Sequence, residues 1–109
     1  MKEFEVLERL SQAGVRFLIA IPDRNGVKIV EATVYDLILL LSDRESVYAR
    51  YHRVSRDAFI AWFNDGFSVK CSHVSGQDVC DHIAIGGQRV TARTYIAMQG
   101  ARCKEHADR

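Results

Sequence analysis

The chain has 109 residues, of which 48% are apolar and 27% are charged. These values are typical of one globular domain and exclude a disordered or collagen-like chain. The formal net charge of +1 excludes a strong overall basic field of the kind that attracts nucleic acid nonspecifically. The uninterrupted apolar runs, such as Leu37 to Leu41, are too short to span a bilayer, and the charged N-terminus lacks a signal-peptide core. We therefore expect a cytoplasmic protein.

Residues 1–66 predict a helix, a β-hairpin and a cluster of short helices. Asn25-Gly26 is a strong hairpin signal between two apolar segments. Thr33 and Asp36 form a weak capping box before a helix that is apolar nearly all round, so we expect that helix at the centre of the core. The expected elements are a helix over 2–13, strands over 15–21 and 27–31, and helices over 34–41, 45–54 and 56–64.

Residues 67–109 have a different pattern. Alternating segments over 67–74 and 79–85 predict two strands joined by the turn 75–78, and Thr91 can cap a helix over 92–99. The tail 101–109 is polar and would fray if nothing held it. We expect one α+β domain over 1–109, in which a mixed α/β core (1–66) precedes a small zinc-binding subregion (67–109).

Three cysteines and one histidine form the strongest functional pattern. Cys71, Cys80, Cys103 and His106 have the spacing C-x8-C-x22-C-x2-H. A hairpin that turns at 75–78 brings the first two together, and C-x2-H spans one helical turn or one tight knuckle. Three Cys and one His are a closed ligand set for structural zinc, which would tie the tail to the hairpin. The sequence therefore predicts a Zn²⁺ site with these four ligands and no catalytic residues.

These residues resemble a small zinc-binding unit of short phage and prophage proteins of bacteria. That pattern has a Cys, a glycine-containing turn, a second Cys and a C-x2-H near the C-terminus. The resemblance covers residues 55–106 and implies zinc binding, a mobile-element origin and action in a bacterial host cell. Gly76 lies one residue further from Cys80 than is common in the pattern, and Asp78 stands where basic residues are common. These differences count against a nucleic-acid role.

Two alternatives to this ligand set stay open. Cys71-x-His73 and Cys80-x-His82 are two C-x-H pairs, and a hairpin that turns about residues 76–77 places all four side chains on one face. Four parallel side chains converge poorly on a tetrahedral ion, so we prefer the set that includes the C-x2-H pair of the tail. Without a metal, the cysteines would be small buried hydrophobes.

A second group of residues suggests a binding surface. Basic and aromatic residues alternate between Arg44 and Arg56, and Arg50 and Arg53 lie three apart on one side of a predicted helix. Such a face suits nucleic acid, with Arg on phosphate and Tyr on a base or sugar, or an acidic protein. The alternative is a solvated helix face. We take Arg50, Arg53 and Arg56 as the candidate partner-binding residues.

Three functions are compatible with these patterns. We favour a non-enzymatic zinc-binding protein that binds a host protein stoichiometrically as a regulator or inhibitor. Its expected interface anchors are the aromatic residues Trp62, Tyr48, Tyr51 and Tyr95. The alternative is a DNA- or RNA-binding transcriptional regulator, in which the helices over 34–64 form a helix-turn-helix variant. A zinc hydrolase or nuclease would need an open coordination position, which four protein ligands do not leave.

Overall fold

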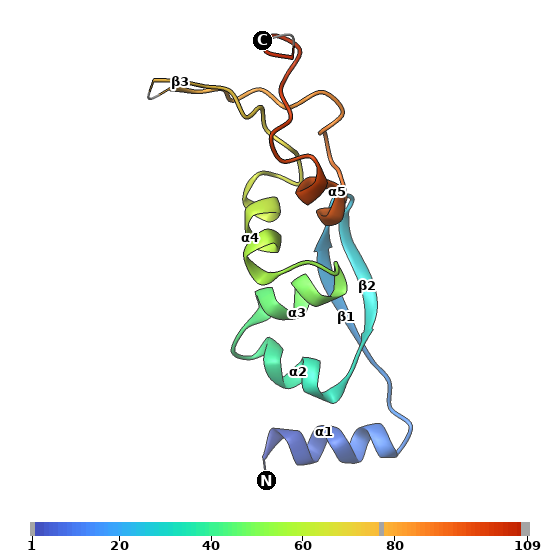
Figure 1. Cartoon of the computed structure of the whole chain (residues 1–109). Coiled ribbons are helices and arrows are strands. Elements are labelled where there is room, and N and C mark those ends of the chain that lie inside the picture. Colours follow the sequence, from blue (N-terminus) through green and yellow to red (C-terminus); the bar gives the residue numbers. More distant parts are fainter. Residues whose placement is uncertain (1, 77, 108–109) are drawn as a thin grey trace.

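The helices and strands form a mixed α+β fold, as the sequence predicts (Figure 1). A computed structural model describes residues 2–76 and 78–107. In chain order the elements are α1 (Glu3–Gln12), β1 (Phe17–Asp23), β2 (Gly26–Ala32), α2 (Val34–Leu40), α3 (Arg44–Tyr51), α4 (Arg56–Asn64), β3 (Val74–Ser75), β4 (Asp78–Val79) and α5 (Ala92–Ala97). The molecule is elongated, with extents of 60 × 23 × 18 Å, and α2, α3 and α4 follow one another along one side of the β1–β2 hairpin (Figure 1). Within these residues, no helix has the length and apolar character needed to cross a membrane.

The predicted hairpin is confirmed, with a shifted turn. β1 and β2 pair antiparallel along their whole length, and the pair Asp23↔Gly26 closes a turn made of residues 24–25. The prediction ended the first strand at Ile21, whereas the strand continues for two further residues. Gly26 has a φ of 112°, which glycine adopts without the steric penalty of a side chain. This freedom lets Gly26 pair as the first residue of β2.

The predicted helices are confirmed to within a few residues at their ends. The structure shows that three helix starts are capped by side chains that accept a backbone N–H: Asp43 for α3, Ser55 for α4 and Thr91 for α5. Each cap satisfies one of the N–H groups that a helix start leaves without an internal partner. These caps explain why short helices follow one another with few connecting residues.

The predicted capping box of α2 is also confirmed, and it extends into a larger network. Thr33 Oγ1 accepts from the Asp36 N–H, and Asp36 Oδ2 accepts from the Thr33 N–H, both at 3.1 Å. The Asp36 side chain is buried, accepts a 2.7 Å hydrogen bond from the Tyr51 hydroxyl and forms an ion pair with Arg50. That hydroxyl also lies 2.7 Å from the carbonyl oxygen of Glu31 in β2. Asp36 therefore connects α2, α3 and the hairpin.

Replacing this carboxylate should destabilise the whole front of the molecule. Asp36→Ala removes the cap and leaves the half-buried Tyr51 and the exposed Arg50 without their acceptor. We expect the free energy of unfolding to fall by about 2–3 kcal/mol, less than for a fully buried pair because the Arg50 side chain is 60% exposed. Urea unfolding followed by circular dichroism measures this change. Asp57→Ala, at an exposed position of α4, is the control, and a change within about 0.5 kcal/mol is expected there.

The expectation that α2 lies at the centre of the core is wrong. Only Val34 and Asp36 are buried in this helix, whereas Tyr35 is 70% exposed. Leu41, which caps the C-terminal end, is 74% exposed. Because α2 packs mainly against α1, α3 and β2, its remaining side faces outward. Apolar character all round a helix thus does not mean burial all round in this chain.

The largest buried cluster lies around Trp62 and joins α4 to the back of the chain. Trp62 Nε1–H donates to the Val90 carbonyl oxygen at 2.9 Å. Gly87 approaches Val69 so closely that a Cβ at position 87 would lie 2.8 Å from the Val69 Cβ, so only glycine fits there. The cluster consists of Ala49, Phe59, Trp62, Val69, Ala84, Val90, Ala92 and Tyr95. Its members come from both sides of residue 66, and the proposed division there stays a prediction.

Tyr95 should give this core a dependence on alkaline pH. Burial, together with its hydrogen bond to Asp65 Oδ2 (2.7 Å), raises the pKa of Tyr95 from 10.0 to about 12. Because the folded pKa is the higher one, this stabilisation is complete below pH 10 and is lost as the pH rises towards 12. Tyr95→Phe should lower the free energy of unfolding by about 1–2 kcal/mol at pH 7 and remove this alkaline phase. Tyr35→Phe, at an exposed ring, should leave the free energy of unfolding at pH 7 and its alkaline pH dependence unchanged.

The back of the chain is less regular than predicted. Strands were expected over 67–74 and 79–85, but β3 and β4 have two residues each. Phe67 has a φ of 64°, a left-handed conformation in which an extended strand does not begin. The two segments still face each other antiparallel, with the Cys71 N–H donating to the His82 carbonyl oxygen at 2.8 Å. The Ser72 N–H donates to the carbonyl oxygen of Ala101 in the tail at 2.9 Å. Position 77 of the predicted turn and positions 108–109 of the tail lie outside the described residues.

Candidate metal centre

Three thiols and one imidazole converge from three segments that are distant in sequence. Cys71 lies just before β3, and Cys80 directly follows β4. Cys103 and His106 lie in a C-terminal turn that the His106 N–H closes by donating to the Cys103 carbonyl oxygen at 3.1 Å. The four ligand atoms all lie within 4.8 Å of one another. This Cys3His cluster (Cys71, Cys80, Cys103 and His106) can bind a metal ion.

The spacing of the ligand atoms suits a tetrahedral ion. The Sγ atoms of Cys80 and Cys103 lie 3.8 Å apart, and His106 Nδ1 lies 3.2 Å from Cys103 Sγ and 3.4 Å from Cys71 Sγ. A tetrahedron with metal–sulfur bonds of about 2.3 Å has edges of about 3.8 Å, and edges that end on nitrogen are shorter. A disulfide requires about 2.05 Å between two sulfurs, and all three cysteines are free. The donor set therefore fits a metal ion and not a disulfide.

Burial and backbone hydrogen bonds prepare the thiols for a cation. Cys71 and Cys103 are each 3% exposed, whereas Cys80 and His106 are half-buried. The backbone N–H of the residue two positions later donates to the sulfur of Cys71 and of Cys80. Such donors stabilise negative sulfur, which is the form that binds metals. The site is thus mostly removed from water and already holds N–H groups directed at two of its thiols.

The three sulfurs influence one another's ionisation. Burial raises the pKa of the Cys71 thiol, but hydrogen bonds from the backbone and from Cys103 and His106 outweigh it and lower this pKa to about 6. The backbone N–H of His82 lowers the pKa of Cys80, yet burial and the neighbouring thiols raise it overall. One thiolate therefore forms readily near neutral pH and opposes a second. A bound cation would relieve that repulsion.

The alternative ligands His73 and His82 lie beside the cluster and are not part of it among the described residues. The predicted opposition across the hairpin is present, since the Cys80 N–H donates to the His73 carbonyl oxygen at 3.2 Å. The His73 ring, however, stacks on His106 with centroids 3.9 Å apart and planes 9° apart. His82 Nδ1 lies 3.9 Å from Glu105 Oε2. Both imidazoles thus pack around the tail turn that carries two of the four ligand atoms.

Comparison with protein families, curated proteins and solved structures finds no match for this chain. The resemblance to phage zinc proteins is supported only as far as the four side chains lie together and can bind a metal. The function must therefore be argued from the chain itself.

The predicted partner-binding arginines do not form one free basic face. Arg50 pairs with the buried Asp36, and Arg56 Nε lies 3.0 Å from Asp43 Oδ1. Arg53 follows α3 with a φ of 60°. Two of the three charges are thus engaged inside the chain, and a role in partner binding stays a prediction.

Two of the predicted interface anchors are in the interior. Trp62 is 0% exposed and Tyr95 is 7% exposed, so neither ring can be a surface anchor in this fold. Their polar atoms bind other parts of the chain instead. Tyr51 directs its hydroxyl to Asp36. Tyr48 lines a pocket between the end of β1, α3 and α4.

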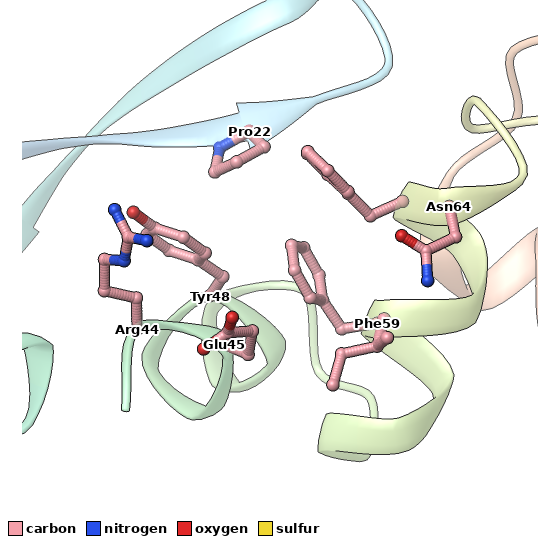
Figure 2. A pocket seen from close by; sticks show the side chains of 8 residues that line it. Pro22, Arg44, Glu45, Tyr48, Phe59 and Asn64 are labelled. Atoms are coloured by element: carbon pink, nitrogen blue, oxygen red, sulfur yellow. The ribbon is translucent and has the colours of Figure 1, made fainter. Parts of the chain in front are cut away.

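That pocket is a structural feature that the sequence did not reveal (Figure 2). It has a volume of about 320 Å³ and lies between the end of β1, α3 and α4. Figure 2 shows Pro22 facing the rings of Tyr48 and Phe59, with Arg44 beside Tyr48. The lining residues are Pro22, Arg44, Glu45, Tyr48, Phe59, Ile60, Phe63 and Asn64. Its residues come from two sequence regions, and only the folded hairpin turn brings Pro22 to the helices.

If a metal holds the three segments together, its removal should loosen the back of the chain alone. The N–H groups of Cys71, Ser72 and Ile85 are bonded across segments to His82, Ala101 and Arg102. Hydrogen exchange with and without a strong chelator should show at least a tenfold loss of protection at these amides. The amide of Leu37 in α2 should be unaffected. Equal exchange with and without the chelator would contradict the prediction.

Proposed function

We propose that the Cys3His cluster binds one Zn²⁺ as a structural site. Zinc accepts sulfur and nitrogen ligands in a tetrahedron and commonly uses three Cys and one His. The observation that carries the proposal is the convergence of Cys103 and His106 of the tail on Cys71 and Cys80. With four protein ligands, the ion has no open position for water or substrate. This supports a non-enzymatic protein in which the metal stabilises the fold.

We further propose that this zinc-stabilised protein acts by binding a partner protein, as a regulator or inhibitor of phage type in a bacterial host cell. The pocket beside Tyr48 supports this role because aromatic and apolar side chains line it and Arg44 and Glu45 lie at it. Its volume is at the lower end for small-molecule sites, about 300–1,000 Å³, and suits one apolar side chain of a partner. Such anchor pockets dominate the binding energy of many interfaces.

The second candidate, binding to DNA or RNA, has weaker support. It relies on Arg50, Arg53 and Arg56, and two of these are held by Asp36 and Asp43. Three thiolates and one Zn²⁺ would change the formal net charge from +1 to 0. A neutral protein depends on local patches for its affinity to phosphate.

Metal analysis tests the zinc site. Mass spectrometry of the purified protein should find about one zinc per chain. Cys103→Ser should lose the metal and, with it, thermal stability, whereas His82→Ala should keep both, because His82 lies outside the cluster. Co²⁺ substitution should give the visible absorption of a tetrahedral thiolate site. A Cys103→Ser variant with unchanged metal content would refute the ligand set.

A retention experiment tests the partner proposal. Immobilised protein should retain one bacterial protein at comparable yield in low and high salt, and Phe63→Ser should reduce this retention at least tenfold, since Phe63 lines the pocket. Ile96→Ser is a matched control, because Ile96 is 45% exposed and Phe63 is 47% exposed. Retention of DNA that falls steeply with salt would favour the alternative function. Equal effects of the two variants on retention would argue against the pocket as the partner-binding site.

A further inference from the structure

The outer face of the β1–β2 hairpin is apolar and uncovered. Antiparallel pairing places alternate residues on opposite faces, and Phe17, Ile19 and Ile21 are on the face that is half-buried or buried. The opposite face, which we call the hairpin face, consists of Leu18, Ala20, Pro22, Val27, Ile29 and Glu31. Leu18 is 66% exposed, Val27 67% and Ile29 60%. The helices cover the other side of the hairpin, as Figure 1 shows.

The elongated chain as a whole also exposes more surface than a compact monomer of its length. The radius of gyration is 18.2 Å, against about 13 Å for a compact domain of this length. The accessible surface is 7512 Å², about 1,400 Å² above the value expected for a folded monomer of 12.4 kDa. A standard interface buries about 800 Å² per partner, and permanent homodimers bury more. The whole chain thus exposes more extra surface than one partner's share of a standard interface, and the hairpin face is one part of this exposed surface.

The charges beside the hairpin face favour a second copy as the occupant. Symmetric dimers bring one patch against itself, so a patch with net charge would repel its copy. The charged side chain on this face is Glu31, which is paired with Arg16. The face is therefore neutral and can meet its own copy without repulsion. A two-stranded sheet is also marginally stable alone and gains from packing on a second sheet.

We propose that the protein forms a two-fold symmetric homodimer in which the hairpin faces of two copies pack against each other. The interface joins Leu18 and Ile29 of one copy to the same residues of the other. The Arg16–Glu31 pairs lie at the rim. This inference is independent of the metal site and does not rest on the function proposed for the pocket. The two surfaces share one residue, Pro22, at the turn end of the hairpin face.

Sedimentation equilibrium and native mass spectrometry of the metal-loaded protein test the proposal. We expect a mass of about 25 kDa, twice the chain mass of 12.4 kDa. Ile29→Lys should weaken dimerisation about 100-fold or more, because it removes two apolar side chains from the interface and opposes two charges. Ile85→Lys is the matched control, since Ile85 has the same 60% exposure, and it should remain dimeric.

Folding controls and a direct contact measurement complete the test. Circular dichroism and metal content should be the same in both variants, because both positions are exposed in the isolated chain. A photoreactive amino acid at Ala20 should crosslink to a β1–β2 peptide of a second copy. A monomeric wild-type protein at 100 µM, a dimeric Ile29→Lys variant, or a crosslink only to a different protein would each overturn the proposal.

Discussion

The back of this molecule depends on bringing three thiols and an imidazole to one point. The segments that carry them contain two strands of two residues each and one closed turn. Backbone hydrogen bonds pair the two hairpin segments, as from Cys71 to His82. Others join these segments to the tail, from Ser72 to Ala101 and from Ile85 to Arg102. A cation at the Cys3His cluster would tie together residues up to 35 positions apart, which otherwise face a large entropy of loop closure. That constraint explains how a polar tail can be ordered without an apolar core of its own.

The buried residues around Trp62 pack the back of the chain, after residue 66, against α4. Trp62 donates to the carbonyl oxygen of Val90, and Val69 packs against Gly87 with no room for a side chain. The segments that carry the Cys3His cluster are thus connected to α4 by the apolar contacts around Trp62. Loss of a bound metal would therefore destabilise the contacts around Trp62 more than the hairpin. The reason is that α2 and the hairpin are held by the separate network of Asp36.

The order of elements and the convergence of the Cys3His cluster were predictable from local chemistry, whereas several tertiary features were not. Caps such as Thr33 and the Asn25-Gly26 signal act within a few residues, so they fix where helices and turns begin. The C-x2-H spacing likewise indicates that Cys103 and His106 face the same point. The predicted burial of α2 was wrong because apolar composition does not show which side of a helix packs against other elements. The predicted strand over 67–74 was too long, because alternation of residue types cannot reveal the left-handed backbone at Phe67. The pocket could not be predicted because it depends on the tertiary packing of Pro22 beside two helices.

The carboxylate of Asp36 has a consequence for how this sequence can change over time. One buried group caps α2, accepts from Tyr51 and pairs with Arg50. A substitution at any one of these positions leaves the others with an unmatched donor or charge, so single changes are costly and compensated pairs are tolerated. In distant descendants of this chain, positions 33, 36, 50 and 51 should therefore vary together. Their joint variation would identify relatives of this fold even where little other sequence similarity survives.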